Sequence, residues 1–536
     1  MTAPTPATLP LSAIGSRVFV VTDADGLTAY AAEYERPLAE SVLFTGLRGD
    51  GPPEVAVDDT GVSVAATGTL TWRDPDGQAR RADPGADAWR WHLSGGSGPV
   101  ELRRHVEAAA AQAAGWADWD ARCPVVDERF AATTRLCWRT LGLNTVRLRS
   151  HPERLAVVPS LFGYVGAWQW DAYFIALGLR HGHPELARDQ VRLVTGPQDA
   201  DGQLPDVVHD TGVLANGRDL PAADQRRLEE QGSSYLGAEV PLTKPPLLLW
   251  TVDQLHAVAP DKAFLAEMID RARANHDWWY RDSVRDSQPC YLHPYSSGLD
   301  DSPTFDTLAG PTPDLAAYLI TADQVLQRLR PEAADPGRRA RTAQWLSGRT
   351  GAATVIDLLA LFAGKADHRH TGPDHRHTGP DHRHPELDHH HPEPDHRHPG
   401  PGNRHPGERR DLSPARAAEL AAALADPTQF GGPVAVATVS RREPAYSSGR
   451  LWRGPVWLNT NLLLATGLRA NGFADLAAQV EASSMRLVEA GGPYEYFDAE
   501  TGAPSRSAVP FFGWTAAIYV DLAVRLSAGS LSAGNG

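Results

Sequence analysis

The feature that most constrains this chain is a near-continuous succession of segments with helical hydrophobic spacing, which begins near Val126. In each segment apolar residues recur at i, i+3, i+4 and i+7, the pattern of an amphipathic helix. Proline opens several segments, as at Pro184 and Pro414, and glycine ends others, as at Gly364. The spacing predicts helices over residues 125–148, 167–180, 184–194, 246–258, 261–281, 313–329, 355–362, 414–424, 451–468, 473–488 and 511–526.

These helices are expected to pack mainly on one another, because almost no strand-like runs separate them. The architectures that satisfy this condition are a bundle, a solenoid or a closed double ring of helices. No sequence repeat of about 30–45 residues favours a solenoid. The chain has 536 residues, of which 42% are hydrophobic, so it is long and apolar enough to bury a large core.

The first part of the chain, residues 1–125, has a different pattern. Short β-branched or alternating runs at 17–21, 41–45, 54–57 and 62–72 are separated by turn sequences such as DADG and DPDG. This pattern predicts an antiparallel β unit. We therefore expect a smaller β-rich N-terminal domain over 1–125, acting in packing or as a lid, before a helical domain over 126–530.

Residues 367–408 interrupt the helical part with six heptads such as DHRHTGP and DHRHPGP. Proline in every heptad excludes a helix, and no heptad offers an apolar core, so we expect a disordered or polyproline-like surface insertion. This insertion carries most of the 21 histidines of the chain. His-x-His pairs can bind divalent zinc, nickel or copper, so two interpretations stay open: adventitious or buffering metal binding, and a neutral expansion of a tandem repeat.

Charge and composition exclude several function classes. The formal net charge is −15, opposite to what a phosphate-tracking nucleic-acid binder needs. No run reaches the ~18–20 apolar residues that span a bilayer, so no membrane partner is expected, and no basic start with an apolar run indicates a secretory signal. Three scattered cysteines do not predict a disulfide framework. We expect an acidic, cytoplasmic enzyme.

The sequence FGYVGAWQWDAYF places Tyr164, Trp168, Trp170 and Asp171 within two turns at a loop–helix junction. Trp168 and Asp171 are at i and i+3, so they share a helix face. A carboxylate beside indoles suits a sugar, because the acid binds hydroxyls and the indole covers the apolar ring face. An ordinary amphipathic core helix with a capped acid explains the same pattern.

The sequence HPYSSGLDDSPTFD contains Asp300, Asp301 and Asp306 among turn-forming residues, so it predicts a loop. Adjacent carboxylates repel each other, which raises the pKa of the less solvated one and gives a route to a general acid near neutrality. The alternatives are an Asx-turn loop and a calcium site, although the spacing is not that of an EF-hand.

A third cluster is split between two segments. SSGRLWRGPVWLNTN places Trp452, Arg453 and Trp457 at an expected helix start, and GGPYEYFDAETGAPS places Glu495 between tyrosines. A carboxylate in an aromatic wall can activate water. Helix-terminal loops with incidental acids remain the alternative.

Taken in order, PSLFGYVGAWQWDAYFIALGL, PPLLLW, HPYSSGLDDSP, LWRGPVWLNTN and YEYFDAETG resemble glycoside hydrolase family 63 and its mannosylglycerate and glucosylglycerate hydrolase-like members. Family 37 trehalases are similar more distantly. The resemblance covers the helical part alone. It implies an (α/α)6 toroid and inverting hydrolysis of an α-linked glucoside or mannoside, with a small carbohydrate substrate and no metal or organic cofactor.

Carried over by motif, the resemblance implies that Asp300 is the general acid and Glu495 the general base. In an inverting enzyme of this kind the two carboxyl groups stand roughly 6.5–9.5 Å apart, with water between them. The residues implied for substrate binding are Tyr164, Trp168, Trp170, Asp171, Lys244, Trp452, Arg453 and Trp457.

Three positions depart from the family pattern. Ser296 stands where Glu is frequent, Asp301 where Asn is usual, and Lys244 where Gln is common. The missing acid at position 296 keeps open a non-catalytic sugar-binding toroid. Another (α/α)6 enzyme such as an epimerase is a further alternative, but it would use histidines, and only His293 falls on the three clusters.

Overall fold

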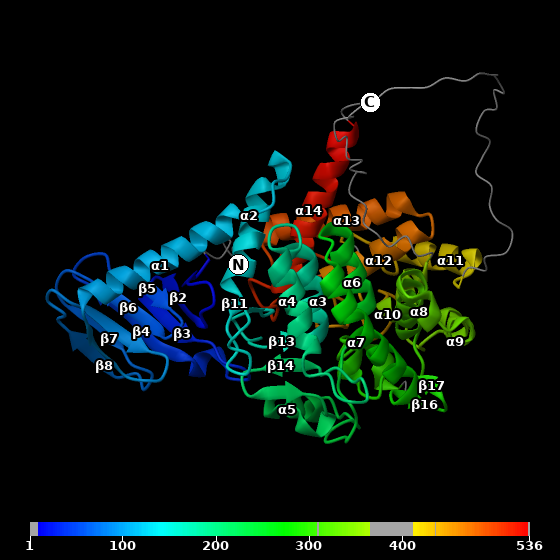
Figure 1. Ribbon diagram of the computed structural model, residues 1–536, viewed down its shortest axis with the longest axis horizontal. Coiled ribbons are helices and arrows are strands. Elements are labelled where there is room, and N and C mark those ends of the chain that lie inside the picture. Colours follow the sequence, from blue (N-terminus) through cyan, green and yellow to red (C-terminus); the bar gives the residue numbers. More distant parts are fainter. Residues whose placement is uncertain (1–8, 308–309, 365–410, 435, 534–536) are drawn as a thin grey trace, which may run out of the picture.

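The computed structural model describes residues 9–307, 310–364, 411–434 and 436–533. The histidine-rich insertion expected at 367–408 lies outside the described residues. The chain is mostly helical and has a β-rich N-terminal region, as the sequence predicts (Figure 1). Within the described residues, no helix combines the length and the apolar character that a membrane crossing requires.

The N-terminal region contains two antiparallel sheets. One has the strand order β1-β2-β3-β4-β7-β8 and the other β10-β9-β6-β5. Phe44 and Trp72 of the first sheet contact Trp91 of the second, with ring centroids 4.3 and 5.1 Å away. The two sheets thus enclose a core of their own. The strands are β1 (Leu11–Ser12), β2 (Val18–Asp23), β3 (Gly26–Ala31), β4 (Val42–Gly49), β5 (Glu54–Asp58), β6 (Gly61–Ala65), β7 (Leu70–Arg73), β8 (Ala79–Ala82), β9 (Ala88–His92) and β10 (Ser97–Val100).

Two features of this region differ from the prediction. The single run expected at 62–72 is divided into β6 and β7, which belong to different sheets. A helix that the sequence did not predict, α1 (Leu102–Ala121), lies along the second sheet (Figure 1). Its buried Gln112 accepts a hydrogen bond from the Val57 amide at 3.0 Å and donates one to the Ser12 carbonyl at 2.8 Å. This polar anchoring weakens the hydrophobic periodicity that sequence reasoning relies on.

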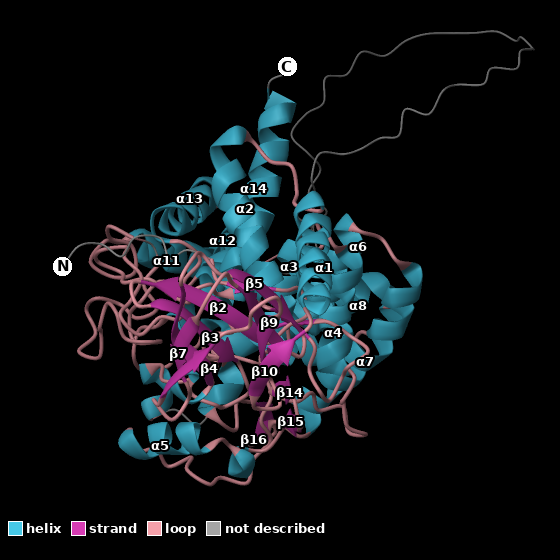
Figure 2. Cartoon of the chain, turned by 90° about the vertical axis from the view of Figure 1, so that its left-hand side faces the viewer, coloured by secondary structure: helices cyan, strands magenta, loops and turns pink. Residues whose placement is uncertain are grey.

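The helical part follows the predicted segments closely. Its helices are α2 (Glu128–Leu143), α3 (Gln169–Leu179), α4 (Pro184–Thr195), α6 (Leu248–Val258), α7 (Lys262–Arg281), α8 (Pro313–Leu329), α10 (Val355–Leu358) with η7 (Leu359–Ala363), α11 (Pro414–Ala425), α12 (Leu458–Ala470), α13 (Ala474–Gly491) and α14 (Gly513–Ala533). Two short helices were not predicted, α5 (Ala222–Glu230) and α9 (Pro336–Thr342). The N-terminal strands lie beside this helical part in Figure 1 and in front of it in Figure 2, which is seen from their side.

The helix predicted from residue 451 begins seven residues later, at Leu458. Pro455 has no amide hydrogen, and a Cβ at Gly454 would lie 2.4 Å from the Ser447 carbonyl oxygen. Val456 instead donates a backbone hydrogen bond to the Phe497 carbonyl at 2.8 Å. This pairing brings the segment before α12 against the loop that follows α13.

Contacts between six elements form a closed cycle. α3 contacts α6, α6 contacts α8, α8 contacts η7, η7 contacts α12, α12 contacts α14, and α14 contacts α3. Further helices cover this cycle: α2 on α14, α4 on α3, α7 on α6 and α13 on α12. Every residue of α3 is buried, whereas α13 keeps one exposed face. Helices that are apolar all round belong in an interior, and amphipathic helices belong at a surface.

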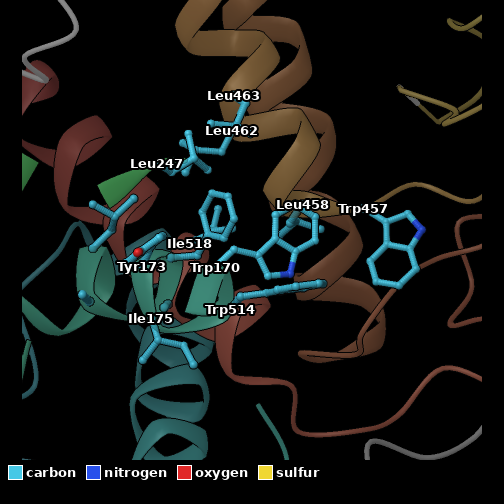
Figure 3. Packing of buried hydrophobic residues seen from close by; sticks show 14 of the residues in the cluster. Trp170, Tyr173, Ile175, Leu247, Trp457, Leu458, Leu462, Leu463, Trp514 and Ile518 are labelled. Atoms are coloured by element: carbon cyan, nitrogen blue, oxygen red, sulfur yellow. The ribbon is translucent and has the colours of Figure 1, made fainter. Parts of the chain in front are cut away.

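Large apolar side chains of the helices in this cycle pack on one another. Trp170 of α3 packs edge-on against Trp514 of α14, with ring centroids 5.6 Å apart. Leu458 and Leu462 of α12 contribute to the same cluster (Figure 3). This packing fixes the N-terminal end of α3, which carries the first of the three sequence clusters.

Candidate active site

Asp300 lies in the turn between η3 (Pro294–Ser297) and η4 (Pro303–Asp306). Gly298 ends η3 with φ +71°, and a Cβ at this position would lie 2.4 Å from Cζ2 of Trp170. Glycine is needed here for both reasons: the left-handed conformation and the close approach of the indole. The loop therefore closes directly on α3, so that Asp300 and the first sequence cluster come together.

The carboxyl group of Asp300 is partly open. Its side chain is 26% exposed, and Lys244 Nζ lies 4.0 Å from Oδ1. Oδ1 is itself buried and has no hydrogen-bond partner within the described part of the chain. Lys244 is engaged elsewhere: it forms an ion pair with Asp206 Oδ1 at 2.8 Å and donates a hydrogen bond to the Tyr295 carbonyl at 2.7 Å. A carboxyl group with this freedom can exchange a proton with an incoming oxygen.

Glu495 lies in the loop after α13 and is only 5% exposed. Tyr164 donates its hydroxyl hydrogen to Oε1 at 3.1 Å, and the Val509 amide donates to Oε2 at 3.2 Å. Burial raises the pKa of Glu495 to about 7, against the effect of these two hydrogen bonds and of the Arg227 charge. The Asp300 carboxylate also raises this pKa, so the two acids interact although they are 195 positions apart in the chain.

Tyr164 and Asp171 face the same group of charges. The Glu495 carboxylate is the largest cause that raises the pKa of Tyr164, followed by burial, and Asp300 adds to it. Burial raises the pKa of Asp171, Glu495 adds to this, and Lys244 opposes it. The structure thus brings together five of the residues singled out in the sequence: Tyr164, Asp171, Lys244, Asp300 and Glu495.

The indoles of the first cluster differ in exposure. Trp170 is buried and contacts Phe174, Trp452 and Trp514. Trp168 ends the short strand β13 (Ala167–Trp168) and is only half-buried. Its ring lies 5.5 Å from that of Tyr164 in an edge-on arrangement. Trp168 is therefore the indole of this cluster that keeps surface for a ligand.

The segment 447–461 contributes packing and ion pairs. Trp457 is 1% exposed and lies in a stack between Trp452, at 3.7 Å, and Tyr496, at 4.5 Å. Both faces of its indole are thereby covered, so the ring has no face left for the sugar contact that was expected of it. Arg453 forms a two-pronged ion pair with Asp306 at 2.6 and 2.9 Å.

Trp452 is held through the acid loop. Asp301 accepts a hydrogen bond from the Trp452 amide at 2.8 Å, and its other oxygen lies 3.7 Å from Arg450 and 3.8 Å from Arg453. Burial raises the pKa of Asp301, against the effect of that hydrogen bond and of both arginines. Asp301 therefore joins the loop of Asp300 to the segment before α12.

Several charged residues at the site were missed by the sequence analysis. Asp206 precedes β14 (Val207–His209), and burial raises its pKa to about 6 against the effect of Lys244. Arg227 of α5 pairs with Asp224 at 3.1 Å, and its pKa, lowered by burial, is raised overall by Asp224, Tyr295 and Asp300. The single carboxylate in the apolar run LPDVV was an available signal for Asp206, but nothing in the polar helix α5 distinguishes Arg227.

Ser296 is buried, and its hydroxyl accepts a hydrogen bond from the Thr243 amide at 3.4 Å. It supplies no carboxylate, but Asp206 and Asp224 bring two others within electrostatic reach of Asp300. Across the described ranges, no group of three or more His, Cys, Asp or Glu residues is arranged to hold a metal ion.

The chain is similar in sequence to known glycoside hydrolases. The family model described as "Mannosylglycerate hydrolase MGH1-like glycoside hydrolase domain" matches residues 164–370 and 409–515. Mannosylglycerate hydrolase MGH1 of Selaginella moellendorffii is 24% identical over 447 residues, which are 73% of this chain and 88% of that protein. Mannosylglycerate hydrolase of Thermus thermophilus is 26% identical over 413 residues, 67% of this chain and 95% of the relative.

A solved structure agrees at the level of the fold. A GH63 mannosylglycerate hydrolase from a second strain of Thermus thermophilus, in complex with Tris and D-glycerate, superimposes with a TM-score of 0.53 at 22% identity. The superposition covers 72% of this chain and 98% of that structure.

Proposed function

The chain belongs to the mannosylglycerate hydrolase MGH1-like group of family 63 glycoside hydrolases, and from this premise we propose that it is an inverting α-glycosidase. Its substrate is a small α-linked glucoside or mannoside. Asp300 is the general acid and Glu495 the general base. The observation that carries this proposal is the pairing of an open carboxyl group with a buried, hydrogen-bonded one in a single charge cluster.

The proposed reaction divides the work between the two acids. Asp300, protonated, gives its proton to the leaving oxygen while the glycosidic bond breaks. Glu495, ionised, takes a proton from a water molecule that attacks the anomeric carbon from the opposite face. The hydrogen bonds from Tyr164 and Val509 orient the Glu495 carboxylate, and a pKa of about 7 suits a base that works near neutrality.

We also propose that the helical part is an (α/α)6 toroid with the site at the mouth of its inner ring. The closed cycle of α3, α6, α8, η7, α12 and α14, covered by further helices, supports this arrangement. In this arrangement Trp170 and Asp171 lie at the inner end of the site, where the sugar that is released from the substrate binds.

The relatives named above are mannosylglycerate hydrolases, so mannosylglycerate and glucosylglycerate belong in the first substrate screen. The purified full chain should be tested on these two compounds and on α-linked di- and oligosaccharides. NMR should record the anomer that is released first. Inversion of an α-glycoside releases the β-anomer, and early release of the α-anomer would reject the inverting mechanism.

A further inference from the structure

The N-terminal region sends one aromatic side chain to the edge of this site. Tyr34 lies in the turn after β3, and its ring stacks on His209 of β14, with centroids 4.1 Å apart and planes 3° from parallel. The same ring lies 6.0 Å from that of Trp168, tilted by 49°. A Cβ at Gly166 would lie 3.3 Å from Cδ2 of Tyr34, so this ring also rests on the backbone that leads into β13.

The turn is held in place by a network of charges between the two regions. Glu33 pairs with Arg149 at 2.7 Å, and the Arg149 amide donates to Asp210 at 2.9 Å. Asp210 also forms an ion pair with Arg17, and both side chains are largely buried. Loss of one partner of such a buried pair strongly destabilises the folded protein. The pair therefore holds the N-terminal region and the helical part in a fixed relative position. These ion pairs therefore hold the turn that carries Tyr34 against the helical part.

Tyr34 is connected to Asp300 through a chain of neighbouring residues. Asp206, at the start of the strand on which Tyr34 stacks, pairs with Lys244, and Lys244 Nζ lies 4.0 Å from Asp300. Tyr34 is half-buried and Glu35 is exposed, whereas Trp170 and Asp171 are buried. Exposure thus increases from the buried Trp170 and Asp171 to the half-buried Tyr34 and the exposed Glu35.

The charges along this path are negative or already paired. Lys244 is paired with Asp206, and Arg227 is paired with Asp224. Glu35 adds a carboxylate at the rim, and burial together with Glu35, Asp206 and Asp224 raises the pKa of Tyr34. An anionic leaving group would meet carboxylates here. The two cations, Lys244 and Arg227, are already paired with carboxylates.

We propose that Tyr34 and Trp168 form an aromatic wall on the leaving-group side of the site, which selects neutral, ring-bearing leaving groups. This inference rests on the proposed hydrolase function and names the substrate class of that site. The matched family segment begins at residue 164, so Tyr34 lies outside it. One half of the wall, Tyr34, is therefore supplied by a part of the chain that the family model does not include, whereas Trp168 lies within the matched segment.

The test compares the full-length wild type with Tyr34→Leu and Tyr34→Ala on phenyl and methyl α-glycosides of the accepted sugar. Loss of the ring should lower kcat/KM for the phenyl glycoside about tenfold and change the methyl glycoside by less than about twofold. Tyr34→Phe should keep most of the activity, since the ring carries the effect. Glu40→Gln, an exposed change six residues further along the chain, is the matched control. Equal losses on both glycosides, or no loss on the phenyl glycoside, would overturn the assignment.

Two further measurements complete the test. The wild type should cleave the phenyl glycoside faster than its 4-carboxyphenyl analogue, and the reverse order would refute the preference for a neutral group. Calorimetric titration in the Asp300→Asn background measures binding of phenyl and methyl glycosides without turnover. If the wild type hydrolyses no α-glycoside, the proposed function fails, but a selective loss of phenyl binding in Tyr34→Leu still supports the wall. Phenyl binding that is absent, or unaffected by Tyr34→Leu, overturns it.

Discussion

The two acids of the site differ in how their surroundings constrain them. Both oxygens of Glu495 accept hydrogen bonds, and the residue is 5% exposed. The Asp300 side chain is 26% exposed, and one of its oxygens has no partner in the described structure. A group that must aim a water molecule benefits from fixed geometry, whereas a group that must reach different leaving oxygens benefits from freedom. The difference therefore corresponds to the two proposed roles.

The largest expected effect comes from removing either acid. Glu495→Gln and Asp300→Asn should each lower kcat by about 10³-fold on natural glycosides, because each removes one proton transfer. An α-glycosyl fluoride separates them, since fluoride leaves without protonation. Asp300→Asn should keep substantial activity on the fluoride, and Glu495→Gln should not.

Glu500→Gln is the matched control for these variants, because Glu500 is in the same loop and pairs with Arg441 at 2.8 Å at the surface. Its turnover should stay at the wild-type level. Full activity in both acid variants would end the assignment of the two roles.

The next effect concerns the charge that lies beside Asp300. Lys244→Met leaves the buried Asp206 without its cation, which should lower the free energy of unfolding by roughly 3 kcal/mol. Urea denaturation measures the change. Arg218→Met breaks an exposed pair with Glu239 and should cost less than about 1 kcal/mol. Equal losses in the two variants would show that the buried pair stabilises the protein no more than the exposed pair does.

A smaller effect tests the hydrogen bonding of Glu495. The base must be ionised, so kcat/KM should rise with pH through the Glu495 pKa of about 7. Tyr164→Phe removes a hydrogen bond to the ionised form of Glu495, so the pKa of Glu495 should rise by about one unit. The acidic limb of the pH profile, where kcat/KM rises with pH, should then move to higher pH.

The pH profile of kcat/KM between pH 5 and 9 measures this shift on a substrate of the screen. Tyr446→Phe, which loses a hydrogen bond to the surface residue Glu500, serves as the control and should leave the limb in place. A limb that moves to lower pH in Tyr164→Phe would contradict the proposed donor role.

The smallest effect is expected from residues 367–408. The five motifs that carry the proposed site lie outside this segment, so its deletion should change kcat/KM by less than about twofold. A larger loss, measured on the accepted substrate, would show that the insertion contributes to one side of the site.

Helix boundaries were predictable where local signals set them. The predicted range of α8 agrees at both ends, because Pro313 opens the helix, and α7 begins one residue after the capping residue Asp261. The prediction was wrong at α1, whose alanine-rich sequence is anchored by polar side chains, and at 451–457, where Gly454 and Pro455 interrupt an apolar run. At α1 contacts distant in sequence decided the outcome, whereas at 451–457 local glycine and proline ended the helical signal before Val456 paired with Phe497.

The composition of the site was predictable only in part. Asp300, Glu495 and the first aromatic cluster stand in motifs, so the printed order of residues was enough to single them out. Arg227, Asp206 and Tyr34 come from segments without such motifs and reach the site through packing alone. The stacking of Trp457 could not be predicted either, because the sequence does not show which aromatic rings stack on one another.

By itself, the sequence determined the succession of helices, the β-rich start and the turns that carry the acids, because these depend on spacing and on the backbone preferences of proline and glycine. Only the tertiary structure decided which charges face one another, which indole keeps an open surface and which pKa values shift. Those properties depend on distance and burial in space, and residues far apart in the chain set both.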